Sequence, residues 1–245
     1  MGDREAPRDV AEAVERATGL PAGERERFSG YGVIGLPFAS GHVLGMRRFP
    51  LSSVGPGYTS VWHRAPDGSW EFWSTATPGL SCARYAGAVS AESRRSDLRI
   101  DWPQPDRLRI TSEDPDLDWE MVVGATRLSS ALTAVARRLP RRFLDRGAVL
   151  SLLGPAAGTL LHTGPLALTG RMPNGQTFRL VPEYVWPLTD GRARLRGADL
   201  GPPGPLPRQA ALGGFRIPQR GLLAAGSVSF DALDPARHST RTVRA

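Results

Sequence analysis

A histidine and a glutamate on either side of a predicted turn are the strongest candidates for acid–base chemistry in this sequence. β-Branched and aromatic residues flank Pro66-Asp67-Gly68, which predicts a β-hairpin closed by a three-residue bulged loop with a left-handed glycine. The register of that hairpin pairs His63 with Glu71, so the carboxylate would orient the imidazole for proton transfer. The same pair could instead be a solvent-facing salt bridge.

Four further polar residues have both a chemical and a structural interpretation. His42 lies in an apolar segment and is either a second acid–base group or a hydrogen-bonded core histidine. Cys82 and Arg84 are expected on one face of a strand over residues 80–89, where the guanidinium could lower the thiol pKa, or the cysteine could simply be buried. His162 could ligate haem or be structural.

Several kinds of chemistry are excluded by residues that the sequence lacks. All 31 basic residues are arginines, and without lysine neither a Schiff base nor a P-loop can form. No two histidines have metal-ligand spacing, and Cys82 is the single cysteine, so we expect neither a metal site nor a disulfide. The glycines at 30, 32 and 35 precede Leu36-Pro37 and not a helix, which argues against a dinucleotide site. The sequence therefore predicts no cofactor.

Aromatic side chains around the same hairpin are the candidates for binding a ligand. The predicted register pairs Trp62 with Phe72 on one face of the hairpin and places Trp73 on the other. Both faces are thus partly apolar, as in a strand that is buried on two sides or lines a cavity. The predicted ligand-binding residues are Tyr58, Trp62, Phe72, Trp73 and Arg84.

Short runs of alternating apolar residues predict a mainly β fold of about ten strands, organised as an antiparallel barrel. A helical period over residues 128–161, divided by Pro140, separates two runs of strands. Further hairpin turns are expected at Pro103-Gln104-Pro105, Pro173-Asn174-Gly175 and Thr189-Asp190-Gly191. The expected organisation is a helix and lead-in over 1–29, one barrel domain over 30–230 and a flexible tail over 231–245.

This layout, from about Tyr31 to Phe230, resembles the lipocalin-like (calycin) barrels, including those of carotenoid hydratases and of some natural-product cyclases. The stretches GLPFASGHVLG, TSVWHR and IPQRGLLAAG also resemble an uncharacterised bacterial protein group, which implies no function. Together with the aromatic hairpin, the layout favours a barrel that holds an apolar or amphipathic small molecule. Such a barrel could be a cofactor-independent hydratase, cyclase or isomerase, or a carrier without catalysis.

The net charge of +7 suggests an anionic partner. Nucleic acid is not expected, because no basic helix, zinc-finger spacing or aromatic RNA-binding motif accompanies the charge. A membrane surface is a possible partner through Arg137, Arg138, Arg141, Arg142 and Arg146, which could also simply face solvent. The N-terminus is charged from its third residue, so we expect no signal peptide and a cytoplasmic protein. The ligand, the strand order and the oligomeric state are open.

Overall fold

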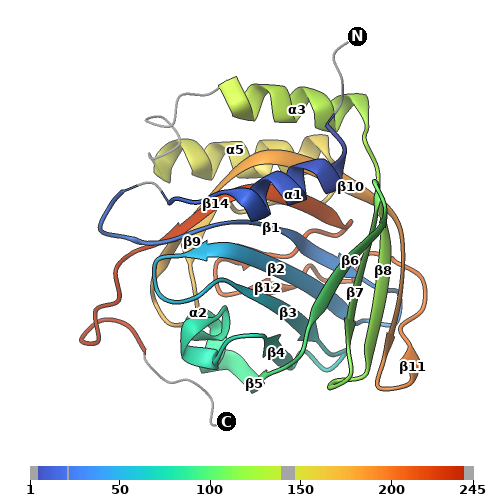
Figure 1. Cartoon of the computed structure of the whole chain (residues 1–245), viewed down its shortest axis with the longest axis horizontal. Helices are drawn as coiled ribbons and strands as arrows, with labels where there is room; N and C mark the ends of the chain where they lie inside the picture. Colours follow the sequence, from blue (N-terminus) through green and yellow to red (C-terminus); the bar gives the residue numbers. More distant parts are fainter. Residues whose placement is uncertain (1–4, 21, 139–146, 240–245) are drawn as a thin grey trace.

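One large curled sheet organises the chain (Figure 1). The computed structural model describes residues 5–20, 22–138 and 147–239. In spatial order the main sheet consists of β5 (Ser90–Arg95), β4 (Trp70–Ser74), β3 (Tyr58–Arg64), β2 (Val43–Ser52), β1 (Glu26–Pro37), β14 (Leu222–Phe230), β10 (Thr177–Leu195), β8 (Leu117–Val123), β7 (Arg107–Ser112) and β6 (Arg99–Gln104). The short strands β9 (Thr169–Arg171) and β11 (Ala198–Asp199) pair with β10, and β12 (Ala211–Leu212) pairs with β13 (Phe215–Arg216).

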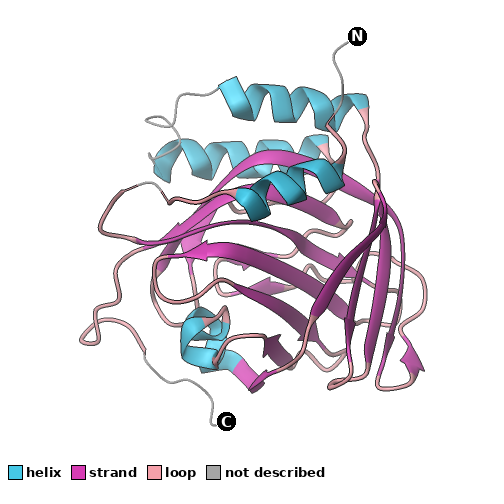
Figure 2. Ribbon diagram, viewed as in Figure 1, coloured by secondary structure: helices cyan, strands magenta, loops and turns pink. Residues whose placement is uncertain are grey.

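The prediction of a mainly β fold with an inserted helical segment is confirmed. The sheet curls into a half-barrel, and its strands are not all antiparallel because β4 and β5 run parallel. The helices are α1 (Pro7–Arg16), α2 (Ala83–Ala86), α3 (Arg127–Arg138) and α5 (Gly147–Leu160), with single 3-10 turns at Pro78–Leu80 and Gly87–Val89. Figure 2 shows α3 and α5 lying side by side along one side of the sheet. No described helix has both the length and the apolar character needed to cross a bilayer.

The predicted hairpin between β3 and β4 is confirmed, with the expected register. His63 pairs with Glu71, and Trp62 pairs with Phe72. Gly68 has a φ of 95°, and its N–H donates to the carbonyl of Ala65, as the bulged loop requires. The hairpin at Pro173-Asn174-Gly175 is confirmed in the same way, because the N–H of Leu180 donates to the carbonyl of Leu168.

The turn predicted at Thr189-Asp190-Gly191 is wrong. β10 continues through it for 19 residues, and the pairing with β8 shifts register at Asp190. The Asp190 carboxylate accepts the Gly191 N–H, so this residue pair forms a bulge in place of a loop. The strand turns only at Arg196 and Gly197, both of which have positive φ.

The strand predicted over residues 80–89 is also wrong, because this segment forms α2 and its two flanking 3-10 turns. Cys82, Ala83, Tyr85 and Ala86 are buried, which is the spacing of a helical face and not of a strand. The chain returns to the sheet only at Ser90, where β5 begins.

The two faces of the β3–β4 hairpin belong to different hydrophobic cores. Trp62 and Phe72 lie in a core with residues of β1, β2, β10 and β14. Val61 and Trp73 lie in a second core, which β6, β7, β8 and α1 complete. Both faces are therefore buried, and the period of two along each strand assigns alternate residues to two separate environments.

Candidate functional site

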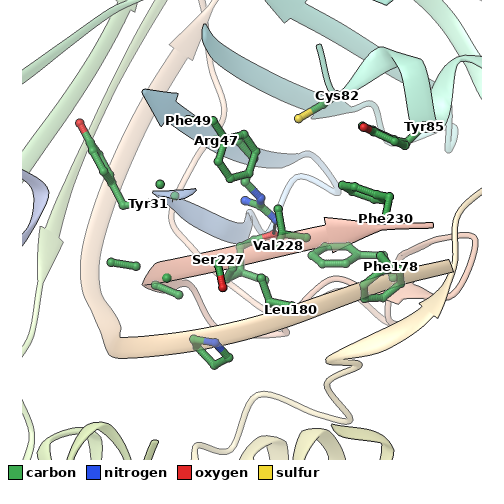
Figure 3. Close-up of a pocket in the computed structure, with 18 of the residues that line it drawn as sticks. Tyr31, Arg47, Phe49, Cys82, Tyr85, Phe178, Leu180, Ser227, Val228 and Phe230 are labelled. Atoms are coloured by element: carbon green, nitrogen blue, oxygen red, sulfur yellow. Dashed lines mark hydrogen bonds between the residues drawn. The ribbon is translucent and has the colours of Figure 1, made fainter. Parts of the chain in front are cut away.

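A cavity of about 60 Å³ lies within the first core, against the face of the hairpin that carries Trp62 (Figure 3). Its walls come from β1, β2, β3, β10 and β14, and Cys82 and Tyr85 close one end. Because side chains two residues apart share a face, Arg47 and Phe49 of β2 both line it. The other apolar lining residues include Ile34, Tyr58, Trp62, Met172, Phe178, Leu180, Phe215, Ala224, Val228 and Phe230. We call this space the inner chamber.

A second cavity, of about 200 Å³, lies between the helices α3 and α5 and the sheet. Its lining is aliphatic, with leucine and alanine side chains from both helices, and we call it the helix-covered chamber. The two chambers adjoin, since they share the lining residues Ile34, Leu180, Pro182, Phe215 and Ala224. Both chambers are lined predominantly by apolar side chains, as is usual for a site that binds an apolar ligand.

Arg47 is the only charged residue among the described residues that line the inner chamber. It is 7% exposed, and its Nη1 donates to the carbonyls of Val33 and Met46. Its guanidinium carbon lies 4.5 Å from the centre of the Trp62 ring, a cation–π contact. Burial lowers the pKa of Arg47 to about 10, so the group stays protonated at neutral pH. The chamber wall therefore carries one positive charge.

The local backbone explains why this arginine points inward. The register between β1 and β2 is irregular between Tyr31 and Leu36, and Val33 and Ile34 lie in that stretch. Their carbonyls accept hydrogen bonds from Arg47. The side chain thus supplies donors where the ladder is interrupted.

Tyr58 and Cys82 are neutral polar groups at the chamber wall. The Tyr58 hydroxyl lies 3.4 Å from the Cys82 sulfur. Burial raises the pKa of the Cys82 thiol, and burial also raises the pKa of the Tyr58 hydroxyl. Of the two alternatives for Cys82, the structure has the buried cysteine, because the thiol pKa is raised and Arg84 lies in α2 and not beside Cys82 on a strand.

Arg84 instead pairs with the buried carboxylate of Glu26, at 2.6 Å. Glu26 also accepts hydrogen bonds from the Tyr85 hydroxyl at 2.6 Å and from the Gln176 amide. Burial raises the pKa of Glu26, but these hydrogen bonds and the Arg84 charge outweigh burial and leave the pKa below its usual value. The Glu26 carboxylate is therefore already paired with Arg84, Tyr85 and Gln176.

The other face of the hairpin holds a connected row of polar side chains. A ring nitrogen of His63 lies 2.9 Å from one of His42, and the other lies 3.2 Å from Glu71. Glu71 in turn accepts from Arg196 at 3.0 Å. His63 is 3% exposed and stacks on Trp73, with ring centres 5.5 Å apart. We call these four groups, His42, His63, Glu71 and Arg196, the histidine row.

The structure divides the predicted site residues between the two faces. Tyr58 and Trp62 line the inner chamber, and Phe72 packs against Trp62 with ring centres 5.8 Å apart. His63, Glu71 and Trp73 lie on the opposite face, where His42 joins them. The sequence argument did not find Arg47, although an arginine in phase with Phe49 on an apolar strand was an available signal.

Within residues 5–20, 22–138 and 147–239, no three His, Cys, Asp or Glu side chains are grouped so that they could hold a metal ion. The lone His162 has a positive φ of 54° at the end of α5.

Fold and cavity together define a mainly β half-barrel with an apolar chamber on one face of its sheet. No protein-family model matches the chain, and no curated protein matches it. Two solved structures are similar over most of their length. One is acetoacetate decarboxylase from Legionella pneumophila subsp. pneumophila str. Philadelphia 1, which is 9% identical over 94% of this chain and 96% of that chain, with a TM-score of 0.41.

The second is another acetoacetate decarboxylase structure, 10% identical over 90% of this chain and 94% of that chain, with a TM-score of 0.42. At these scores the likeness carries no argument about the reaction or the ligand of this protein. The expected similarity to carotenoid hydratases and natural-product cyclases has no support from these comparisons.

Proposed function

We propose that this protein binds an apolar or amphipathic small molecule in the inner chamber and the adjoining helix-covered chamber. The observation that carries the proposal is the continuous apolar lining, in which aromatic side chains of the sheet meet aliphatic side chains of α3 and α5. Burial of an apolar ligand there would remove its surface from water without a polar group of the protein losing its partner.

Tryptophan fluorescence tests this proposal. Trp62 is the only tryptophan among the described residues that line either chamber, so a bound ligand should quench or shift its emission. Titration with a panel of apolar and amphipathic compounds should give a saturable response that Trp62→Phe removes. Trp102→Phe is the matched control, since Trp102 packs against the second core and should leave the response intact. A panel without any response in the wild type would refute the proposal.

Acid–base catalysis at the histidine row is the second candidate function. Its support is the unbroken contact from His42 through His63 to Glu71, which could move a proton along the row. The row lies on the face of β3 opposite the inner chamber, so a reacting molecule would need its own position near His42. Binding without catalysis is therefore the better supported function. Turnover of a bound compound that His63→Gln abolishes, while binding remains, would establish the enzyme instead.

Contact with a membrane surface is a further candidate. Val135, Leu152 and Leu160 are 55%, 76% and 48% exposed on the two helices that cover the ligand space. Of the arginines proposed to dock there, Arg141, Arg142 and Arg146 lie outside the described residues. Flotation with anionic liposomes should move the wild type but not Leu152→Ser if these helices touch the lipid. A wild type that stays at the bottom of the gradient would exclude this function.

A further inference from the structure

We propose that the ligand is an amphipathic carboxylate whose headgroup binds Arg47 and whose apolar chain extends into the helix-covered chamber. This inference rests on the proposed binding function. It adds the chemical class of the ligand and its orientation.

Arg47 carries a positive charge that is buried in the chamber wall. Removing a guanidinium from water is costly unless an anion compensates it. No described carboxylate forms an ion pair with Arg47, and Tyr58 and Cys82 beside it are held neutral by burial. Glu26 is engaged with Arg84 and Tyr85. A bound carboxylate would supply the missing negative charge.

The hydrogen bonds of Arg47 are concentrated on one of its nitrogens, Nη1. The two hydrogens of Nη1 go to the carbonyls of Val33 and Met46, while Nη2 has one long contact of 3.5 Å with Ile34. Among the described residues, Nε–H of Arg47 has no hydrogen-bond partner in the structure. Nε and Nη2 form the edge of a guanidinium that binds both oxygens of a carboxylate side by side. On that edge, the long contact between Nη2 and Ile34 is the one protein hydrogen bond among the described residues.

The two chambers differ in size and in the side chains that line them. Figure 3 shows Arg47 among the side chains that line the inner chamber, which include Phe49 and Val228. The smaller chamber thus holds the charge, and the larger one, about 200 Å³, holds aliphatic side chains. Ile34, Phe215 and Ala224 stand where the two meet. A molecule with one anionic end and one hydrocarbon end matches this division.

The ligand could also bind in the reverse orientation, with its carboxylate in the helix-covered chamber, and a variant of this chain tests that. The exposed Arg216 is the only charged residue among the described residues that line the helix-covered chamber. A carboxylate bound there would leave its chain pointing toward Arg47. Arg216→Met is therefore the matched control for Arg47→Met.

The experiment is isothermal titration calorimetry with decanoate and decanol, which share a chain and differ in headgroup charge. We expect the wild type to bind decanoate about ten- to hundredfold more tightly than decanol, as for a charge-assisted hydrogen-bonded pair. Arg47→Met should remove that preference and leave the decanol affinity within about threefold, whereas Arg216→Met should change neither. Ala157→Trp, which narrows the helix-covered chamber, should weaken both ligands about equally.

Each contrary result has a distinct meaning. Equal binding of the two ligands by the wild type would overturn the headgroup inference and leave the binding function standing. Loss of the preference in Arg216→Met, and not in Arg47→Met, would overturn the orientation. Absence of binding by either ligand would overturn the inference and count against the binding function itself. If Arg47→Met fails to fold, the wild-type affinities for decanoate and decanol still test the headgroup inference, because that comparison needs no variant.

Discussion

The two faces of the β3–β4 hairpin adjoin buried polar side chains that are paired in different ways. On one face, the histidine row satisfies its own members, since His63 contacts both His42 and Glu71, and Glu71 binds Arg196. On the other face, Arg47 donates only to backbone carbonyls, and its charge has no described counter-ion. Burial and unusual residue types therefore do not by themselves mark a binding site. The proposed site rests instead on a buried charge that has no described counter-ion and that lines a cavity.

Replacing one tryptophan on each face by alanine should give the largest difference in the free energy of unfolding between the two faces. Trp73 is 0% exposed in the filled second core, so Trp73→Ala should lower the free energy of unfolding by about 3–5 kcal/mol. Trp62 already borders a cavity, so Trp62→Ala should cost less, about 2 kcal/mol. Urea denaturation measures both. Equal losses would mean that the chamber is packed as tightly as the second core.

The turn that assigns residues to faces is the next test. Gly68 has a φ of 95°, so Gly68→Val should lower the free energy of unfolding by about 1–3 kcal/mol through backbone strain. The nearest atom to a new Cβ would be the flexible end of Arg64, which can move, so the strain is in the backbone. Asp101→Val, at an exposed position of β6, is the control and should be nearly neutral. If the two variants are equally stable, the loop does not require a left-handed residue.

The parts of the fold that could be predicted from the sequence are those set by contacts between residues close together in the chain. Gly68 and Gly175 close hairpins through contacts within a few residues, so local sequence predicted both registers. Thr189-Asp190-Gly191 has similar residues but forms a bulge, because β14 and β8, distant in sequence, hold β10 extended on both sides of it. In the segment over 80–89, the helical turns are set by packing against distant strands, including the stacking of Tyr85 on Phe230.

The chamber itself was beyond a sequence argument. Alternation shows that Trp62 and His63 face opposite ways, yet it does not show which face meets a cavity and which meets a second layer of strands. Those facts depend on α5, β10 and β13, which begin at Gly147, Thr177 and Phe215, far beyond the end of the hairpin at Ser74. The sequence shows Arg47 as an arginine on an apolar strand. The hydrogen bonds that its guanidinium forms, however, depend on the irregular pairing of β1 with β2.

The smallest effect we predict concerns the pH dependence of stability on the face with the histidine row. The hydrogen bond from His63, and then the hydrogen bond and charge of Arg196, hold the pKa of Glu71 below its usual value despite partial burial. A carboxyl group whose pKa is lower in the folded state than in the unfolded state stabilises the protein above the unfolded pKa of about 4.5. That contribution is lost as the pH falls through the folded value. Glu71→Gln should therefore flatten the decline of the unfolding free energy below about pH 4.5, measured by urea denaturation from pH 7 to pH 3.

The control for that measurement is Glu113→Gln, which removes a carboxylate whose side chain is 84% exposed and should retain the wild-type decline. His63→Gln should flatten the decline in part, because it removes the largest of the causes that lower the pKa of Glu71. Identical acid profiles for the wild type and Glu71→Gln would show that the row is not held together by this charge. In that case the difference between the two faces would rest only on Arg47, whose charge has no described counter-ion.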